Sequence, residues 1–253
     1  MPTVWTYERY LDAMAAGATA YVTTVAGTDP TTPVPTCPQW TLADLHRHHG
    51  TTYRWVDHLV RTGTRARIWS RDVPKELPDD PAALPDWVAA GAGRLLDTLR
   101  GTDPDSPLWT WGAGRTARFW PRRVLHEATV HGADATIALG GSPTVDPDIA
   151  ADGIEEFLLN LPHAAWIAPR LAGAGPDGAS ILLRPNGSAD GWRILFTEGW
   201  FEWGRGDEGT AEVTGSPGDL LLLLYGRLGA GDPRLTVSGT GSLLTDWLSV
   251  LTF

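Results

Sequence analysis

The stretch WPRRVLHEATVHGADATIALG, residues 120–140, carries the most informative spacing of polar side chains in the sequence. Its small and apolar residues predict a helix, in which Glu127 and His131 are four positions apart. Two side chains at that spacing lie on one helix face, close enough to bind a single cation. His126 is five positions from His131, which excludes the H-E-x-x-H pattern of zinc proteases. The stretch therefore predicts a Glu/His pair that needs a third ligand from elsewhere.

The composition indicates a globular protein with two domains. The chain has 253 residues, more than a typical single domain, and 42% of them are hydrophobic while 20% are charged. A net charge of −10 argues against nucleic acid as the main partner, because binding to phosphates needs clustered Lys and Arg. The sequence has no apolar run long enough to span a membrane and no signal-peptide pattern at its start. We therefore expect a cytoplasmic protein without a membrane partner.

Cysteine usage narrows the kinds of site that the chain can form. Cys37 is the only cysteine, so neither an intramolecular disulfide nor a cysteine-rich zinc site is available. A single cysteine also fits a reducing compartment.

The first half of the chain predicts four helices. Thr41 and Asp44 form a capping-box pattern that begins one helix, and Asp86 is a suitable N-cap for another. Segments rich in Pro, Thr and Gly separate the helices and predict long loops. The predicted helices cover residues 4–25, 41–62, 87–99 and 120–140. Such a bundle commonly holds a metal between side chains that project inward from facing helices.

The pattern changes after Gly140, where turn-forming residues predict a linker and a domain boundary between residues 143 and 144. Short alternating segments separated by Pro-Asn-Gly and Glu-Gly turns then predict strands at residues 180–183, 192–197, 200–203, 211–214 and 235–238. Helices are expected at residues 149–161, 216–228 and 243–250. The leucine-rich helix at 216–228, which starts with Ser-Pro, should lie buried against the sheet. Residues 1–143 and 144–253 are thus expected to form a helical and an α+β domain.

Three motifs resemble the mycothiol-dependent maleylpyruvate isomerase family, a branch of the DinB-like four-helix proteins. They are VPTCPQWTLADL at residues 34–45 followed by His48, RRVLHEATVHGADA at 122–135, and DLLLLLYGRL at 219–228. Their order along the chain also matches the family. The resemblance implies an α+β protein of two domains: an N-terminal DinB-like metal-binding four-helix bundle and a small α/β sandwich-like C-terminal domain.

The resemblance also implies the ligands and cofactors. The family's metal triad falls on His48, Glu127 and His131, and its thiol cofactor is mycothiol, the low-molecular-weight thiol of actinobacteria. Two imidazoles and a carboxylate leave one position of a tetrahedral divalent ion, most suitably zinc, open for a thiol or water. A thiol bound there is deprotonated near neutral pH. His49 competes with His48 for this role, but it points about 100° away on the same helix.

The third motif implies a catalytic residue in the C-terminal domain. Arg227 matches the family's Gly-Arg, and a guanidinium suits a substrate carboxylate or a developing enolate. It also suits the end of a helix, where the dipole favours a cation. Gly132 and Ala133 stand where the family often has bulky residues, so the resemblance does not determine the identity of the substrate.

The leading functional hypothesis is a metal- and mycothiol-dependent enzyme that adds the thiol to a small electrophilic molecule. Elimination after bond rotation makes the enzyme a cis-trans isomerase, and retention of the adduct makes it an S-transferase. The alternatives are a hydrolase that uses metal-bound water and a non-catalytic, metal-stabilised ligand-binding protein. We expect a monomer. Trp109, Trp111 and Trp120 are candidates for the wall of an apolar pocket.

Overall fold

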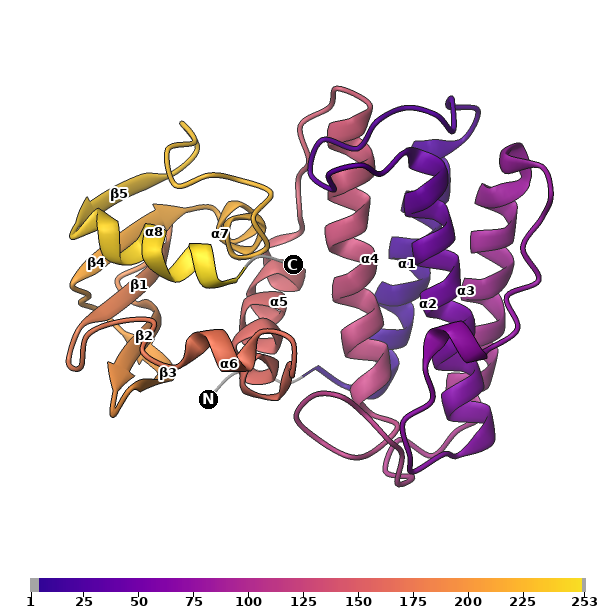
Figure 1. The fold of residues 1–253 in the computed structure, drawn as a ribbon, viewed down its shortest axis with the longest axis horizontal. Coiled ribbons are helices and arrows are strands. Elements are labelled where there is room, and N and C mark those ends of the chain that lie inside the picture. Colours follow the sequence, from indigo (N-terminus) through magenta and orange to yellow (C-terminus); the bar gives the residue numbers. More distant parts are fainter. Residues whose placement is uncertain (1–4, 252–253) are drawn as a thin grey trace. The chain divides into compact units, whose positions relative to one another are not determined.

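The computed structural model describes residues 5–251, which form two compact units. The first unit ends at Pro143 and the second begins at Thr144. The first unit is helical, and the second combines a sheet with helices (Figure 1). The predicted α+β class is therefore confirmed.

The first unit is a four-helix bundle. Helices α1 and α2 each pack against both α3 and α4, so every helix has two neighbours (Figure 1). Two short 3-10 helices lie in the connection between α2 and α3. The bounds are α1 (Tyr7–Val25), α2 (Leu42–Thr62), η1 (Ser70–Asp72), η2 (Pro81–Ala83), α3 (Leu84–Arg100) and α4 (Phe119–Ala138).

The helix starts show which local signals determine the boundaries. The predicted capping box at the start of α2 is present: the Thr41 side chain accepts from the Asp44 backbone, and the Asp44 carboxylate accepts from the Thr41 backbone. The predicted N-cap of the third helix was wrong. Helix α3 begins at Leu84, directly after η2, and Asp86 lies in its first turn. The carboxylate that caps this region belongs to Asp80, which accepts the backbone N–H of Ala82.

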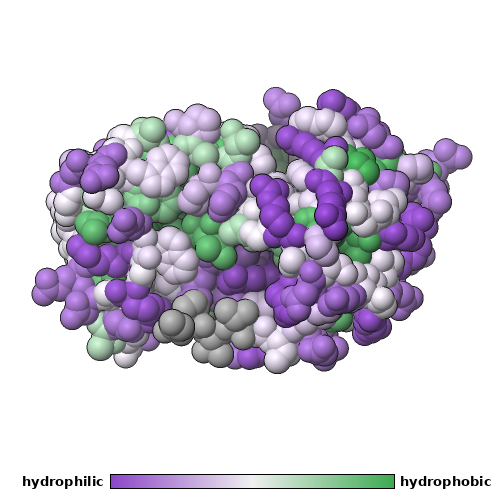
Figure 2. All heavy atoms as spheres, turned by 90° about the horizontal axis from the view of Figure 1, so that it is seen from below, coloured by the Kyte–Doolittle hydropathy of each residue, from purple (hydrophilic) through white to green (hydrophobic). Residues whose placement is uncertain are grey.

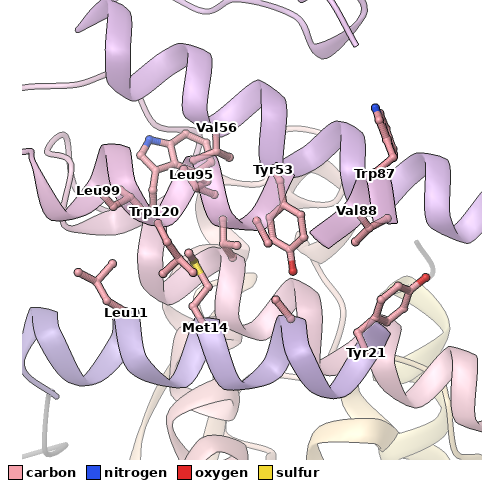
Figure 3. Close-up of a cluster of buried hydrophobic side chains, with 14 of the residues drawn as sticks. Leu11, Met14, Tyr21, Tyr53, Val56, Trp87, Val88, Leu95, Leu99 and Trp120 are labelled. Atoms are coloured by element: carbon pink, nitrogen blue, oxygen red, sulfur yellow. The ribbon is translucent and has the colours of Figure 1, made fainter. Parts of the chain in front are cut away.

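The core of the bundle lies between all four helices (Figure 3). Large side chains from each helix are almost completely buried, including Met14, Tyr53, Leu95 and Trp120. Burial of one such side chain stabilises the fold by roughly 1.5–3 kcal/mol relative to its exposure. Trp120, a candidate pocket wall, is instead part of this core, with its ring 5.3 Å from that of Trp55.

Helices α2 and α3 approach closely at two glycines. A Cβ atom on Gly50 would lie 2.1 Å from the ring of Trp87, and one on Gly91 would lie 2.4 Å from Nη1 of Arg54. The Arg54 guanidinium lies 3.8 Å from the centre of the Trp87 ring and donates to the backbone oxygens of Gly50 and Trp87. Only glycine leaves room for this contact between the helices.

We predict that Gly50→Ala lowers the free energy of unfolding by about 1–3 kcal/mol, because the new methyl group overlaps the rigid Trp87 ring. The cost of the overlap should exceed the roughly 1 kcal/mol by which alanine stabilises a helix interior relative to glycine. Gly93→Ala is the matched control, since Gly93 is exposed on α3 and a Cβ there meets no atom within 4 Å. Urea unfolding should show a loss for the first variant and a small gain for the second. Equal effects would contradict the close contact.

The second unit contains a five-stranded sheet with the order β3-β2-β1-β4-β5. The pair β1 and β4 is parallel, and the other neighbouring pairs are antiparallel. The strands are β1 (Ser180–Pro185), β2 (Gly191–Thr197), β3 (Trp200–Gly206), β4 (Ala211–Gly215) and β5 (Thr236–Gly239). The helices are α5 (Pro147–Asn160), η3 (Leu161–His163), α6 (Ala168–Leu171), α7 (Pro217–Leu224) and α8 (Gly241–Val250).

Both faces of the central strand are covered. Ile181, Leu182 and Leu183 are consecutive in β1 and fully buried, although successive side chains of a strand point to opposite faces. Trp247 of α8 packs on the sheet, with its ring 5.5 Å from that of Phe196. Helix α7 begins at Pro217 after the N-cap Ser216, as the Ser-Pro pattern predicted, but it is shorter than expected. It ends at Leu224, two residues before a glycine in the left-handed conformation.

On the face drawn in Figure 2, hydrophilic side chains predominate, and hydrophobic ones appear in small groups between them. None of the helices within residues 5–251 is both long enough and apolar enough to cross a membrane.

Candidate metal centre

Three side chains from two helices converge on one point of the bundle. His48 lies on α2, and Glu127 and His131 lie one turn apart on α4, which packs against α2. The Nε2 atom of His48 is 2.8 Å from Oε1 of Glu127, and the Nε2 atom of His131 is 3.3 Å from the same oxygen. The structure thus brings together the three residues that the sequence predicted as metal ligands.

The donor atoms fit a divalent cation. The three candidate ligand atoms lie within 4.8 Å of one another. In a tetrahedral zinc site with bonds of roughly 2.0–2.1 Å, neighbouring donor atoms are roughly 3.3 Å apart, close to the spacing around Glu127 Oε1. Two imidazoles and one carboxylate are also a donor set of catalytic zinc sites. The His48 side chain keeps 38% of its surface exposed, so the group is not sealed inside the bundle.

The second oxygen of Glu127 has its own partner. Nη2 of Arg123 lies 3.1 Å from Oε2, and the Arg123 side chain is only 10% exposed. Burial alone would raise the pKa of Glu127. Hydrogen bonds with His131 and His48, together with the charges of His131 and Arg123, hold that pKa well below its usual value. Glu127 is therefore ionised.

His131 interacts with a carboxylate on each side of its ring. Its Nδ1 atom is 2.8 Å from Oδ2 of Asp134, opposite the nitrogen that faces Glu127. Burial would lower the pKa of His131, but the hydrogen bonds with Asp134 and Glu127 and their negative charges raise it to about 9. In the absence of a cation, His131 is thus protonated at neutral pH.

Two aromatic side chains lie beside these groups. The ring of Trp40 is 5.1 Å from the ring of His48 and stacks at 6.3 Å on that of His131. Trp111 lies beside the Arg123 guanidinium, with 5.9 Å between the guanidinium carbon and the ring centre. Of the tryptophans proposed as pocket walls, Trp111 is thus near the site, while Trp120 belongs to the core.

Two further histidines of α2, His46 and His49, face the interior of the bundle. Nδ1 of His46 is 2.7 Å from Oη of Tyr21, and His49 is completely buried between Tyr21 and Tyr53. Within the part of the chain that the structure describes, neither ring nitrogen of His49 has a hydrogen-bond partner. Burial, together with the charge of His131, holds the pKa of His49 well below its usual value, so it is neutral. His49 is not in the converging group, and of the two competing histidines His48 alone joins it.

Arg227 lies in the second unit, after the end of α7. It follows Gly226, which has a φ of 72°. Its Nη1 atom donates a 2.7 Å hydrogen bond to the backbone oxygen of Tyr225. Arg227 therefore contacts the end of α7, the helix-end position that the sequence analysis gave as the alternative to a catalytic role.

Sequence reasoning missed several parts of the site. Arg123 and Asp134 lie four residues before Glu127 and three after His131, so helical spacing was a usable signal for both. Thr36 and Cys37 also reach this region, through contacts with Asp134 that span 98 and 97 residues. No local pattern indicates contacts of that range.

Comparisons with known proteins identify the family. Residues 11–136 match the family model described as "Mycothiol maleylpyruvate isomerase N-terminal domain", and residues 148–245 match "MDMPI C-terminal domain". The chain belongs to the mycothiol maleylpyruvate isomerase family. The resemblance seen in the sequence is thus confirmed, and membership of this family identifies the protein as an enzyme.

Two similar solved structures come from the same family. One is described as the mycothiol-dependent maleylpyruvate isomerase, with a TM-score of 0.62, and the other as a histidine-to-alanine mutant of that enzyme, with a TM-score of 0.65. In both cases the identity is 18%, and the alignment covers 92% of this chain and 93% of the other. At this identity the structures support the shared fold. Comparison with curated proteins found no significant match.

For this family member, we predict that the metal-free protein loses stability as the pH rises from about 6.5 to about 9. The pKa of His131 is about 9 in the folded chain, against roughly 6.5 in an unfolded one. The resulting stabilisation is complete below the unfolded value and is lost as the pH rises through the folded one. Urea unfolding with a chelator present should show a smaller pH slope for His131→Gln than for the wild type. Equal slopes would rule out a raised pKa for His131.

Proposed function

We propose that this protein is a divalent-metal and mycothiol-dependent enzyme whose ion is held by His48, Glu127 and His131. The observation that carries the proposal is the convergence of two imidazole Nε2 atoms on one carboxylate oxygen. Zinc suits this mixed set of nitrogen and oxygen donors. Membership of a family named for mycothiol supports the thiol as cofactor.

The chemistry that the centre supports is activation of a thiol. His48, Glu127 and His131 would hold a divalent cation, which would supply a lowered pKa to a thiol that binds beside it. Both oxygens of Glu127 have partners: Oε1 faces the two histidines, and Oε2 forms an ion pair with Arg123. Glu127 is therefore not available as a general base. Cys37 lies 3.5 Å from the Asp134 carboxylate, whose negative charge disfavours a thiolate, so Cys37 is a poor nucleophile.

The substrate in this proposal is a small electrophilic molecule. Addition of the thiol to a conjugated double bond permits rotation about that bond, and elimination then returns the thiol and the isomerised product. The family name favours this isomerase route for the chain. Transfer of the thiol with retention of the adduct is the second candidate, because the same activated thiol serves both reactions.

The proposal predicts that His48→Ala and His131→Ala lose the metal. Each variant leaves two ligands, so affinity should fall by more than the roughly 10–100-fold typical of losing a supporting partner. Elemental analysis should find about one divalent ion per wild-type chain, and calorimetry should detect mycothiol binding to that form alone. Turnover of an electrophile should then depend on both the metal and mycothiol.

His49→Leu is the matched control. It replaces the neighbouring buried histidine, which is not in the converging group, by an apolar side chain of similar size. This variant should keep its metal and its mycothiol binding. Metal loss in His49→Leu, metal retention in His48→Ala, or turnover that is equally fast without mycothiol would each contradict the proposal.

We further propose that Arg227 pairs with a carboxylate or a developing enolate of the substrate, as its match to the family's Gly-Arg implies. The hydrogen bond to Tyr225 supports this role because it orients the guanidinium.

Arg227→Lys should therefore lower kcat at least tenfold, since an ammonium cannot form the same paired hydrogen bonds. The metal content, measured by elemental analysis, should stay at the wild-type value. Unchanged kcat at full metal content would leave Arg227 with only a structural role.

A further inference from the structure

A second carboxylate lies directly behind the candidate metal centre. Asp134 is three residues after His131 on α4, so the two side chains share a helix face. Oδ2 of Asp134 is 2.8 Å from Nδ1 of His131, and the Asp134 side chain is completely buried. A buried carboxylate is costly to desolvate unless its oxygens accept hydrogen bonds, so the contacts of Asp134 show how it is held.

The segment before α2 supplies further donors to this carboxylate. Thr36 donates its hydroxyl to Oδ1 at 2.5 Å, and the thiol of Cys37 lies 3.5 Å from Oδ2. Both oxygens of Asp134 therefore accept hydrogen bonds. Because Thr36 and Cys37 precede α2 and Asp134 lies on α4, these contacts link two segments of the first unit and fix the position of the carboxylate.

These contacts determine which ring nitrogen of His131 carries a proton and which can bind a cation. The oxygens of Asp134 already accept hydrogen bonds from Thr36 and Cys37, so Nδ1 of His131 donates the proton of its contact with Oδ2. In a neutral imidazole the lone pair is then on Nε2. That nitrogen is the one 3.3 Å from Glu127 Oε1, on the side where His48 also converges. The tautomer favoured by Asp134 thus presents its lone pair to the position of the cation.

Cys37, His131 and Asp134 also lie close enough together to form a separate donor group. A cation among them would have to replace the Nδ1 proton of His131 and the hydrogen bonds from Thr36 and Cys37. His131 would also have to serve two cations through its two nitrogens. The hydrogen bonds in place favour a supporting role for this group over a second cation site.

We infer that Asp134 is a positioning residue, which fixes the tautomer and ring orientation of His131 and is itself held by Thr36. The inference rests on the proposed metal-dependent function and adds residues that act through a ligand instead of binding the ion. Partners of this kind typically raise metal affinity 10–100-fold.

The test compares Asp134→Asn with Asp57→Asn. The first change keeps the shape of the side chain but removes the charge that favours the Nδ1 proton. Asp57 is the matched control, since it also accepts from a threonine hydroxyl, that of Thr98 at 2.6 Å, and lies nine residues from His48 on α2. Zinc affinity, measured by competition with a chromophoric chelator, should fall about 10–100-fold in Asp134→Asn. It should stay at the wild-type value in Asp57→Asn.

A second readout reports on the imidazole directly. In zinc-loaded protein with ¹⁵N-labelled histidine, the Nδ1 proton of His131 should exchange slowly in the wild type and faster in Asp134→Asn. A purely structural effect would lower stability without this local change. If Asp134→Asn fails to fold, Thr36→Val provides the test, because it removes one donor to the carboxylate and should produce a smaller change in both measurements.

The outcomes separate this inference from the proposed function. If wild-type protein binds no zinc, the proposed function fails, and the positioning role fails with it. If His48→Ala loses zinc while Asp134→Asn and Thr36→Val match the wild type in affinity and proton exchange, only the positioning role is wrong. Two zinc ions per chain would also overturn it, since within residues 5–251 the other group that could hold an ion is the one around Cys37.

Discussion

The carboxylate of Glu127 lies among three cationic or hydrogen-donating groups inside the bundle, and the geometry of the site follows from that contact. Oε1 faces the imidazoles of His48 and His131, and Oε2 faces Arg123. Desolvation alone would favour the neutral acid, whereas these partners keep the group ionised. The arrangement holds a negative charge at the position where a divalent cation would bring two positive ones. The same groups can therefore exist with a bound proton at His131 or with an ion, and the two compete for one imidazole nitrogen.

The contact between His48 on α2 and Glu127 on α4 requires a constant distance between the two helices. Packing in the rest of the bundle maintains that distance. The core between the helices is closely packed around Met14, Tyr53 and Trp120, and Gly50 and Gly91 let α3 approach α2 at the Trp87 ring. Packed interiors transmit small displacements instead of absorbing them. A shift of α2 would thus change the position of His48 relative to the pair on α4. Residues that touch no ligand are expected to affect the site through this route.

The segment that leads into α2 serves the site in two ways. Thr36 and Cys37 contact the carboxylate behind His131, while Trp40 lies against the rings of His48 and His131. The capping box at Thr41 then sets the first turn of α2 and with it the angular position of His48. A short run of residues therefore links the start of a helix to both sides of the candidate centre.

Features that depend on neighbouring residues could be predicted from the sequence: the four helices of the bundle, the places of the strands β1 to β5, the capping box at Thr41 and the pairing of Glu127 with His131. They follow from hydrogen bonds and side-chain spacing within a few residues, which sequence patterns record directly. The family resemblance added His48, and helical spacing could have added Asp134. Only the tertiary structure decided that His46 and His49 face the core, that Trp120 is core instead of a pocket wall, and that Thr36 reaches Asp134. These outcomes depend on which helix faces meet when the chain folds, and contacts across dozens of residues have no local periodicity to reveal them.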